Sequence, residues 1–259
     1  MKTYGVKITT AKEEDMIEQT IDKLNQMKLF GMAKELSRQM QVPDSSALSF
    51  EERFSLLVDM EMTSRDNRRL SRLLKGARLR ENASIEDIDF RTNRGLDRSM
   101  IISLASCAWV VKHYNVLITG PTGVGKTFIA CALANQACRH GHSAIYYRAP
   151  RLLSELKIAR ADGSYVKLLN RLAKTEVLVV DDWGINALSE PERRDILEVV
   201  EDRYKMRSTI VVSQIPVNKW HDVVANPTIA DAILDRLVHN AYKIDLRGGS
   251  MRKQSQDLT

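Results

Sequence analysis

Through roughly the first 75 residues, apolar side chains recur every three or four positions, which is the spacing of one face of an α-helix. Two successive stripes of this kind are Ile17, Ile21 and Leu24, and then Leu29, Met32, Leu36 and Met40. The pair Ser49 and Glu52 has the spacing of a capping box and predicts that a further helix begins there. No strand pattern precedes about residue 115, so residues 1–80 are predicted to form an all-helical module.

The pattern changes after that point, where short apolar runs typical of buried strands alternate with helical stretches. The five expected strands span residues 116–119, 144–147, 177–180, 209–213 and 241–246. Alternation of this kind predicts an α/β domain with a five-stranded parallel sheet that helices wind on both sides. We place this domain at residues 99–259, and we predict that the polar segment 81–98 before it is a linker.

Between the second and third expected strands, residues 149–172 are predicted to form a helical hairpin where a shorter connection would suffice. Apolar positions at helical spacing support two helices, and Ala161-Asp162-Gly163 separates them. Basic residues are frequent in this insertion. A solvated insertion without a binding role is the alternative interpretation.

The composition suits a chain that buries one large core or two small ones, since 44% of its 259 residues are hydrophobic and 28% are charged. A net charge of +6 favours a polyanionic partner, although this excess is mild. The cysteines Cys107, Cys131 and Cys138 form no C-x-x-C motif, which indicates a reducing compartment. The first ten or so residues lack the apolar core of a signal peptide, and no apolar run reaches the ~18 residues of a membrane span. We therefore expect a cytoplasmic protein without a membrane partner.

Residues 120–127 match G-x-x-x-x-G-K-[ST], the pattern of a phosphate-binding P-loop. They are Gly120, Pro121, Thr122, Gly123, Val124, Gly125, Lys126 and Thr127. Glycines allow a tight turn that directs main-chain N–H groups at a phosphate, while Lys126 reaches the β- and γ-phosphates and the Thr127 hydroxyl ligates Mg²⁺. A strand precedes the loop and a helix follows it from Phe128, so the helix N-terminus also faces the anion. This context favours a nucleotide site over an ordinary glycine turn.

A second acidic element follows the third expected strand, where Val177–Val180 is succeeded by Asp181 and Asp182. Ligands of open α/β sheets lie at the carboxyl ends of the strands, and this sequence places both acids there. Asp181 is expected to hold Mg²⁺, usually through a water, and Asp182 to polarise the attacking water. Aspartate is one methylene shorter than the usual glutamate, so slow or partner-dependent hydrolysis is expected. The alternative is a strand that ends in a solvated acidic turn.

Two further segments carry polar side chains of kinds that act in ATP hydrolysis. Ser213 and Gln214 follow the fourth expected strand, and either side chain has the position to contact the γ-phosphate or the attacking water. The sequence does not distinguish between them. Arg236 lies on a helix predicted at 229–238, where it acts either as an arginine finger for a neighbouring subunit or as part of a salt bridge within the helix.

The most basic part of the chain is residues 65–80, with seven basic residues and a single acid, Asp66. Its candidate DNA contacts are Arg65, Arg68, Arg69, Arg72 and Lys75. Solvated helix faces usually mix both signs, so nearly single-sign charge favours phosphate contacts and makes residues 1–80 a candidate module for binding DNA or a partner. The hairpin adds the candidates Arg151, Lys157, Arg160 and Lys167.

Taken together, four strings resemble the IstB family of AAA+ ATPases. They are residues 120–127, Ala159-Arg160-Ala161-Asp162-Gly163, Asp181-Asp182-Trp183-Gly184 and Asp235-Arg236-Leu237. Members of that family are encoded with a transposase in bacterial insertion sequences and are related to the DnaC-type loaders of the replicative helicase. The resemblance covers nearly the whole chain. The P-loop is specific only for the superfamily, whereas the second and third strings point to the IstB branch.

The resemblance implies an ATP-dependent helper of DNA transposition, which assembles on duplex DNA with little sequence preference, remodels it and stimulates the cognate transposase. It implies ATP and Mg²⁺ at Lys126 and Thr127, and a Walker B pair at Asp181 and Asp182. It also implies that Arg236 serves the ATP of a neighbour in a homo-oligomer, and that Arg252 is a second sensor of the γ-phosphate. The hairpin at 149–172 corresponds to a motif that faces DNA in this clade. Residues 247–259 are too few for the usual helical lid domain, a shortening that this branch shares.

A DnaC-type loader of the replicative helicase is the alternative function, because the nucleotide domain barely separates the two. The basic segment 65–80 favours DNA over a helicase partner, and the N-terminal module shows no zinc-binding cysteines of the kind some loaders carry. A small-molecule kinase is disfavoured, since the sequence shows no arginine-rich lid.

Overall fold

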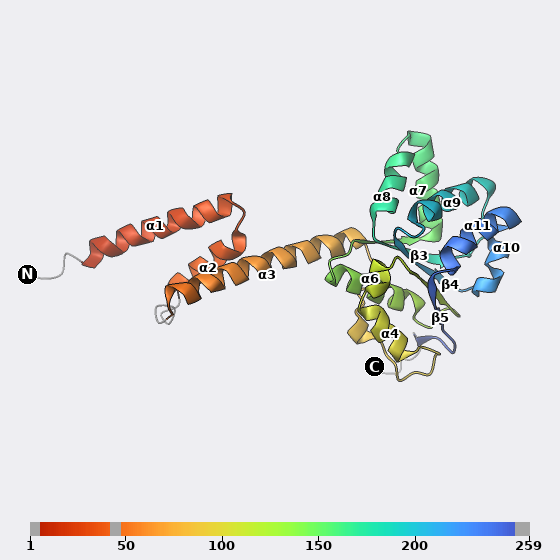
Figure 1. Cartoon of the computed structure of the whole chain (residues 1–259), viewed down its shortest axis with the longest axis horizontal. Helices are drawn as coiled ribbons and strands as arrows, with labels where there is room; N and C mark the ends of the chain where they lie inside the picture. The colour runs from red at the N-terminus through yellow and green to blue at the C-terminus, as the bar shows by residue number, and fades with distance from the viewer. Residues whose placement is uncertain (1–5, 42–47, 252–259) are drawn as a thin grey trace, which may run out of the picture. The chain divides into compact units, whose positions relative to one another are not determined.

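The computed structural model of the chain describes residues 6–41 and 48–251 (Figure 1). The chain divides between Ser71 and Arg72 into two compact units. We describe each unit by itself. The division falls inside a long helix, so the last turns of that helix belong to the C-terminal unit.

The described part of the N-terminal unit is helical throughout, which agrees with the sequence pattern. Its helices are α1 (Val6–Gln26), α2 (Phe30–Gln41) and the first part of α3 (Phe50–Ala77). The capping box is present at the start of α3, where the Ser49 N–H donates to Glu52 at 2.7 Å and the Glu52 N–H donates to Ser49 Oγ at 3.2 Å. These reciprocal bonds satisfy donors that the first turn of a helix otherwise leaves free.

Glu61 links α3 to the start of α2. Its carboxylate accepts the N–H groups of Gly31 at 2.7 Å and Met32 at 3.3 Å, which lie in the first turn of α2. It also pairs with Arg65 at 2.7 Å and Arg68 at 3.2 Å on its own helix. Burial acts to raise the pKa of Glu61, but these hydrogen bonds outweigh it and hold the pKa below its usual value. The carboxylate therefore stays charged and caps α2.

The segment 81–98 differs from the predicted linker, because it is packed into the C-terminal unit. Ala83, Ile88 and Arg94 are buried, and the short helix η2 (Ile85–Asp87) contacts α6. Two further helices, α4 (Arg98–Ala105) and α5 (Ala108–Val111), follow before the sheet. A polar composition indicates that a segment is mostly solvated, but a few apolar anchors and one buried arginine are enough to dock it.

The C-terminal unit contains the five-stranded parallel sheet that the sequence predicts. Its strands are β1 (Asn115–Thr119), β2 (Ala144–Arg148), β3 (Val177–Trp183), β4 (Ser208–Ser213) and β5 (Ala241–Asp245). They lie in the order β2-β3-β4-β1-β5, and every adjacent pair is parallel. All carboxyl ends therefore meet at one edge, and β4 separates the P-loop strand β1 from the acidic strand β3.

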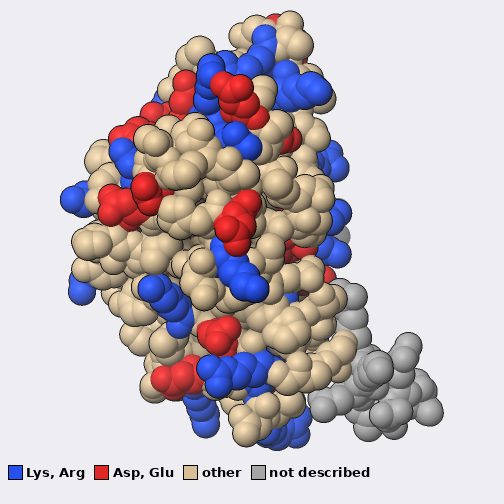
Figure 2. Space-filling view, turned by 90° about the vertical axis from the view of Figure 1, so that its right-hand side faces the viewer, with Lys and Arg blue, Asp and Glu red and all other residues tan. Residues whose placement is uncertain are grey.

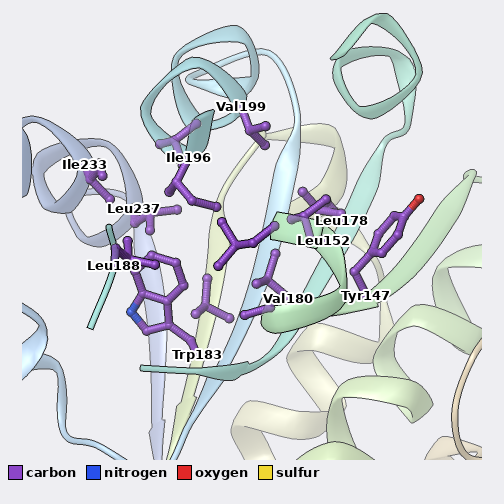
Figure 3. Close-up of a cluster of buried hydrophobic side chains, with 14 of the residues drawn as sticks. Tyr147, Leu152, Leu178, Val180, Trp183, Leu188, Ile196, Val199, Ile233 and Leu237 are labelled. Carbon is purple, nitrogen blue, oxygen red and sulfur yellow. The ribbon is translucent and has the colours of Figure 1, made fainter. Parts of the chain in front are cut away.

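Helices cover both faces of this sheet (Figure 1). The helix α6 (Lys126–Arg139) packs on one face, and α4 packs on α6. The opposite face carries α7 (Ala149–Asp162), α9 (Glu190–Arg203) and α11 (Pro227–Val238). The core between these helices and β3 is formed by apolar side chains such as Leu152, Val180, Ile196 and Leu237 (Figure 3). The short helices η3 (Val217–Lys219) and α10 (Trp220–Val224) complete this layer.

The hairpin between β2 and β3 forms as predicted, with α7 followed by α8 (Tyr165–Lys174). Gly163 ends α7 with a φ of +78°, a conformation that favours glycine. Arg160 stacks on the Tyr165 ring at 3.8 Å and donates to the buried carboxylate of Asp195 on α9 at 2.7 Å. These contacts join both helices of the hairpin to α9.

Candidate functional site

The P-loop turns between β1 and α6 through glycine-dependent conformations. Gly123 and Gly125 have φ values of +86° and +93°, which L-residues with side chains rarely adopt. A Cβ at Gly125 would lie 2.5 Å from Arg94 Nη1, and one at Gly123 would lie 2.3 Å from Ser250 Oγ. The loop is therefore enclosed by residues of the preceding segment and of the segment after β5.

Lys126 is the first residue of α6, and its side chain folds back over the loop. Its Nζ donates to the carbonyls of Gly120 and Pro121, each at 2.7 Å. Burial lowers the pKa of this ammonium, while the nearby charges of Asp181 and Asp182 act to raise it. A buried cation at a helix N-terminus, where main-chain N–H groups are also free, is a strong site for a phosphate chain.

Asp181 lies at the carboxyl end of β3 and is almost fully buried, at 1% exposure. Its Oδ2 accepts hydrogen bonds from Thr127 Oγ1 at 2.8 Å and from the Tyr146 hydroxyl at 2.7 Å. Its Oδ1 accepts the main-chain N–H of Asp182 at 2.7 Å. The structure thus brings together Thr127 and Asp181, the two residues that the sequence predicts as the metal site.

The chemistry of this pair fits Mg²⁺, which prefers hard oxygen donors and keeps some ligand positions for water and substrate phosphates. Thr127 and Asp181 supply one hydroxyl and one carboxylate oxygen to the lining of the cavity. Across residues 6–41 and 48–251, no group of three or more histidine, cysteine or acidic side chains is arranged to hold a metal ion. A cation here would accordingly depend on phosphate oxygens as well as on the protein.

Asp182 has a φ of +60°, and the pairing of β3 with β4 is irregular between Val180 and Trp183. Such an irregularity redirects a side chain at the end of a strand. The Asp182 carboxylate accepts a hydrogen bond from Arg148 Nε at 2.5 Å, and Arg80 Nη1 lies 3.9 Å from the same oxygen. Two guanidinium groups therefore face the carboxylate predicted to act on water.

The structure separates Ser213 from Gln214. Ser213 is fully buried, and its hydroxyl donates to the Trp183 carbonyl at 2.7 Å and accepts the Ile215 N–H at 3.0 Å. Ser213 does not line the cavity and its hydroxyl joins β4 to β3, so Gln214 is the better placed of the two predicted contacts for the phosphate or the water. Gln214 lines the cavity, and its Oε1 accepts the Thr122 hydroxyl at 2.8 Å.

A cavity of about 720 Å³ unites these groups. Residues 122–128 of the P-loop and α6 form one side, with the exception of the buried Val124, and Phe128 lies at its edge. Asp181 and Asp182 form the floor at the end of β3, and residues between 80 and 94 form another wall. Met251 also lines the cavity, and its N–H donates to the Gly123 carbonyl at 2.9 Å. The volume suits a nucleotide with its phosphate chain.

Of the two other predicted arginines, Arg252 lies outside the described residues. Arg236 does not line this cavity. Arg236 projects from α11, where its Nε lies 2.5 Å from Glu201 on α9. It lines a different, small pocket together with Asn115 and Thr209, which stand at the amino ends of β1 and β4. Within one chain, Arg236 is therefore at the opposite edge of the sheet from the P-loop.

The predicted DNA contacts differ in how far the fold engages them. Arg65 and Arg68 pair with Glu61, and Arg160 pairs with Asp195, so their charges are partly balanced within the chain. The side chain of Arg151 is 79% exposed and lies 3.9 Å from Glu155. The remaining candidates Arg69, Arg72, Lys75, Lys157 and Lys167 are exposed. DNA contact remains a prediction for all of these residues.

The side of the C-terminal unit on which α10 and α11 lie shows both signs of charge intermingled (Figure 2). A duplex carries one negative charge per ~1.7 Å of its axis and is best matched by single-sign charge. This side is therefore a poor match for DNA. Among the described residues, α8 presents a more uniformly basic, open surface that includes Lys167, Arg171 and Lys174.

Three residues of the site were not assigned to it from the sequence. Arg148 ends β2 directly beside Asp181 of β3, and Tyr146 lies two residues earlier. An arginine at the carboxyl end of a strand is a usable signal only when that strand is known to be the neighbour of β3. Arg80 is the last residue of the basic segment 65–80, and no local pattern relates it to a carboxylate beyond residue 180.

Comparison with known proteins identifies relatives of this chain. Residues 22–259 match the family described as IstB-like ATP binding protein. The putative insertion sequence ATP-binding protein y4pL of Sinorhizobium fredii is 48% identical over 237 residues, which cover 92% of this chain and 97% of that protein.

Solved structures support the fold. The crystal structure of DnaI superposes with a TM-score of 0.56 and 25% identity, covering 64% of this chain and 91% of that one. The crystal structure of the DnaC helicase loader gives a TM-score of 0.51 and 20% identity over 64% of this chain and 97% of that one. The C-terminal unit is therefore an AAA+ domain of the kind found in these proteins.

Proposed function

Because this chain belongs to the family of IstB-like ATP-binding proteins, we propose that it is an ATPase that assembles on duplex DNA of any sequence and assists the transposase of an insertion sequence. The observation that carries the ATPase proposal is the contact of Thr127 with Asp181 at 2.8 Å, beside Lys126 in the cavity. The similarity to y4pL, a putative insertion sequence ATP-binding protein, supports the role in transposition.

The chain's residues divide the binding of ATP among them. The N–H groups at the start of α6 and the ammonium of Lys126 hold the phosphate chain. Thr127 and Asp181 hold Mg²⁺, which when bound neutralises charge on the β- and γ-phosphates. Met251 and residues of the segment 80–94 enclose the rest of the nucleotide, because they line the same cavity.

Hydrolysis then depends on Asp182 and Gln214. Asp182 accepts a hydrogen bond from the attacking water and so raises the nucleophilicity of that water. Its Oδ2 becomes available for this role once Arg148 no longer donates to it. Gln214 also lines the cavity, where it is hydrogen-bonded to Thr122. Its amide contacts the water or the γ-phosphate. Both residues act at the carboxyl edge of the sheet.

Assembly completes the site in this proposal. Arg236 is remote from the P-loop of its own chain, and it supplies its guanidinium to the ATP of a neighbouring subunit. Turnover therefore rises with protein concentration, or with DNA that gathers the subunits. The DNA contacts come from the exposed basic residues of α3 and of the α7–α8 hairpin.

A second candidate is a loader of the replicative helicase. It is kept as a candidate because the C-terminal unit has the fold of the DnaC helicase loader, a likeness that at 20% identity concerns the fold alone. Under this alternative the N-terminal unit docks onto a protein, and single-stranded DNA is the preferred nucleic acid.

Sedimentation of the protein with duplex and single-stranded DNA of unrelated sequences, with and without ATP, separates the two candidates. Large ATP-dependent assemblies on any duplex support the transposition helper. Binding confined to single strands, or seen only when a replicative helicase is added, supports the loader.

A further inference from the structure

Tyr146 is a buried tyrosine of β2 whose hydroxyl reaches the predicted metal site. It is 9% exposed, and its hydroxyl donates to Asp181 Oδ2 at 2.7 Å. The same oxygen accepts the Thr127 hydroxyl at 2.8 Å. A tyrosine hydroxyl carries its proton at neutral pH, so it acts as a donor to the carboxylate.

Arg80 continues this chain of contacts. It is close enough to the Tyr146 hydroxyl to interact with it electrostatically, and its Nη1 lies 3.9 Å from Asp182 Oδ2. A guanidinium has no acceptor, so the Tyr146 hydroxyl turns its lone pairs towards Arg80 and its hydrogen towards Asp181. Arg80 lies three residues after the end of α3.

The orientation of Asp181 depends on these bonds. One carboxylate oxygen is held by the main-chain N–H of Asp182 and the other by the side chains of Thr127 and Tyr146. When Thr127 turns its oxygen towards a cation, the Tyr146 hydroxyl still holds the carboxylate in place. Groups that orient a metal ligand in this way typically contribute about 10- to 100-fold to metal affinity.

We propose that Tyr146 is a positioning residue for the divalent cation bound with ATP, and that Arg80 acts through it by fixing the direction of the Tyr146 hydroxyl. This inference rests on the proposed binding of Mg²⁺ and ATP at Thr127 and Asp181. It adds that the geometry of this cation site depends on Tyr146 and on Arg80, which follows α3.

Tyr147 provides a matched control on the same strand. It is similarly buried, at 4% exposure, and belongs to the core on the opposite face of the sheet (Figure 3). Its hydroxyl donates to Glu155 on α7 at 2.8 Å and not to a carboxylate of the cavity. The substitution Tyr147→Phe therefore removes an equivalent buried hydroxyl without touching the cation site.

The test measures Mn²⁺ binding to the full chain by the loss of the free-ion paramagnetic resonance signal, in the presence of a non-hydrolysable ATP analogue. We expect Tyr146→Phe to weaken Mn²⁺ affinity by about 10-fold or more, and Tyr147→Phe to change it by less than about 2-fold. Affinity for the analogue in EDTA is expected to stay within about 2-fold for both variants, because the P-loop is intact.

Equal Mn²⁺ affinities of the two variants would overturn the inference. So would a loss of analogue affinity in EDTA confined to Tyr146→Phe, since that would place the effect in the loop and not at the cation. A wild-type protein that binds no Mn²⁺ with the analogue would overturn the proposed function and this inference with it, so the two failures are distinguishable.

Arg80→Gln tests the second step without disturbing the core, because the Arg80 side chain is 42% exposed. We expect a loss of about 3- to 10-fold in Mn²⁺ affinity, smaller than that of the ligand-contacting tyrosine. In a Tyr146→Phe background the same change should have no further effect, because the two residues act in series. Independent, additive losses would overturn the role of Arg80.

Discussion

Arg148 Nε and Asp182 Oδ2 lie 2.5 Å apart across the carboxyl ends of β2 and β3. The bond joins a strand that leads directly into the α7–α8 hairpin to the carboxylate expected to act on water. An oxygen that already accepts a charged donor is a weaker acceptor for water. We therefore expect the pair to restrain the proposed hydrolysis in the form of the protein described by the structure.

Replacing Arg148 by alanine should increase the basal rate of ATP hydrolysis by about 3- to 10-fold. A free general base typically accelerates a reaction by about 100-fold or more, and the variant recovers part of this factor. Steady-state phosphate release without DNA measures this. Arg151→Ala is the control, since Arg151 is exposed on the following turn and lies near Glu155. A rate that falls in Arg148→Ala would show that the arginine holds Asp182 in its working position.

Lys126→Ala should reduce ATP affinity by about 100-fold, because it removes charge-assisted hydrogen bonds worth roughly 1.5–3 kcal/mol. Equilibrium titration with a fluorescent ATP analogue gives the affinity directly. Lys112→Ala removes an exposed lysine of the same unit and should leave the affinity unchanged. Undiminished binding in Lys126→Ala would contradict the assignment of the P-loop.

Arg236→Ala should abolish turnover, with a loss of at least about 100-fold, while nucleotide binding by the dilute protein stays within about 2-fold. Because Arg236 also pairs with Glu201 at 2.5 Å, Glu201→Gln is the matched control that breaks the ion pair but keeps the guanidinium. The finger assignment requires that Glu201→Gln remain active. Parallel losses of activity and melting temperature in both variants would instead assign Arg236 to the stability of its own subunit.

Exchanging both Arg72 and Lys75 for glutamine should weaken duplex binding and reduce the log–log salt slope by about 0.9 per lost phosphate contact. Fluorescence anisotropy over a range of salt concentrations measures the slope. Arg194→Gln, which removes an exposed arginine paired with Glu190 on α9, should leave it unchanged. An unaltered slope in the double variant would make this part of α3 a solvated helix face.

Acidification should loosen the start of α2 through Glu61. The pKa of Glu61 lies below its usual value of 4.5 in the folded protein, so this contribution to stability is present above about pH 4.5 and is lost as the pH falls through the lowered pKa. Hydrogen exchange at the amides of Gly31 and Met32, corrected for intrinsic rates, follows it. Glu61→Gln should show faster exchange at neutral pH and no titration in this range. Identical pH profiles of the two proteins would contradict the capping role.

Local patterns identified the parts of the site that lie close together along the chain. The P-loop could be predicted because its eight consecutive residues form one loop that requires particular residue types. The strands could be predicted because each short apolar run has to be buried. The capping box of α3 was predicted for the same reason, since Ser49 and Glu52 contact each other within one turn. The parallel direction of the strands followed from their alternation with helices.

Relations between distant residues were a different matter. Ser213 and Gln214 are adjacent in sequence, yet the Ser213 hydroxyl donates to the Trp183 carbonyl, whereas Gln214 lines the cavity. Side chains of neighbouring strand residues point to opposite faces, so which of the two reaches the cavity depends on how β4 is placed in the sheet. The segment 81–98 likewise became part of the site because Arg94 donates to the Val124 carbonyl at 2.8 Å, a contact that its polar composition does not announce.

The amino-acid sequence by itself determined the helical start of the chain, the parallel α/β domain, the P-loop and the acidic end of β3, because each depends on the type and spacing of a few neighbouring residues. The tertiary structure alone decided how these parts are connected. It placed Tyr146, Arg148 and Arg80 on the two carboxylates of the cavity and Arg236 at the far edge of the sheet. The physical reason is that strand order and helix docking bring together groups dozens of residues apart, and no local pattern of polarity specifies which of them meet.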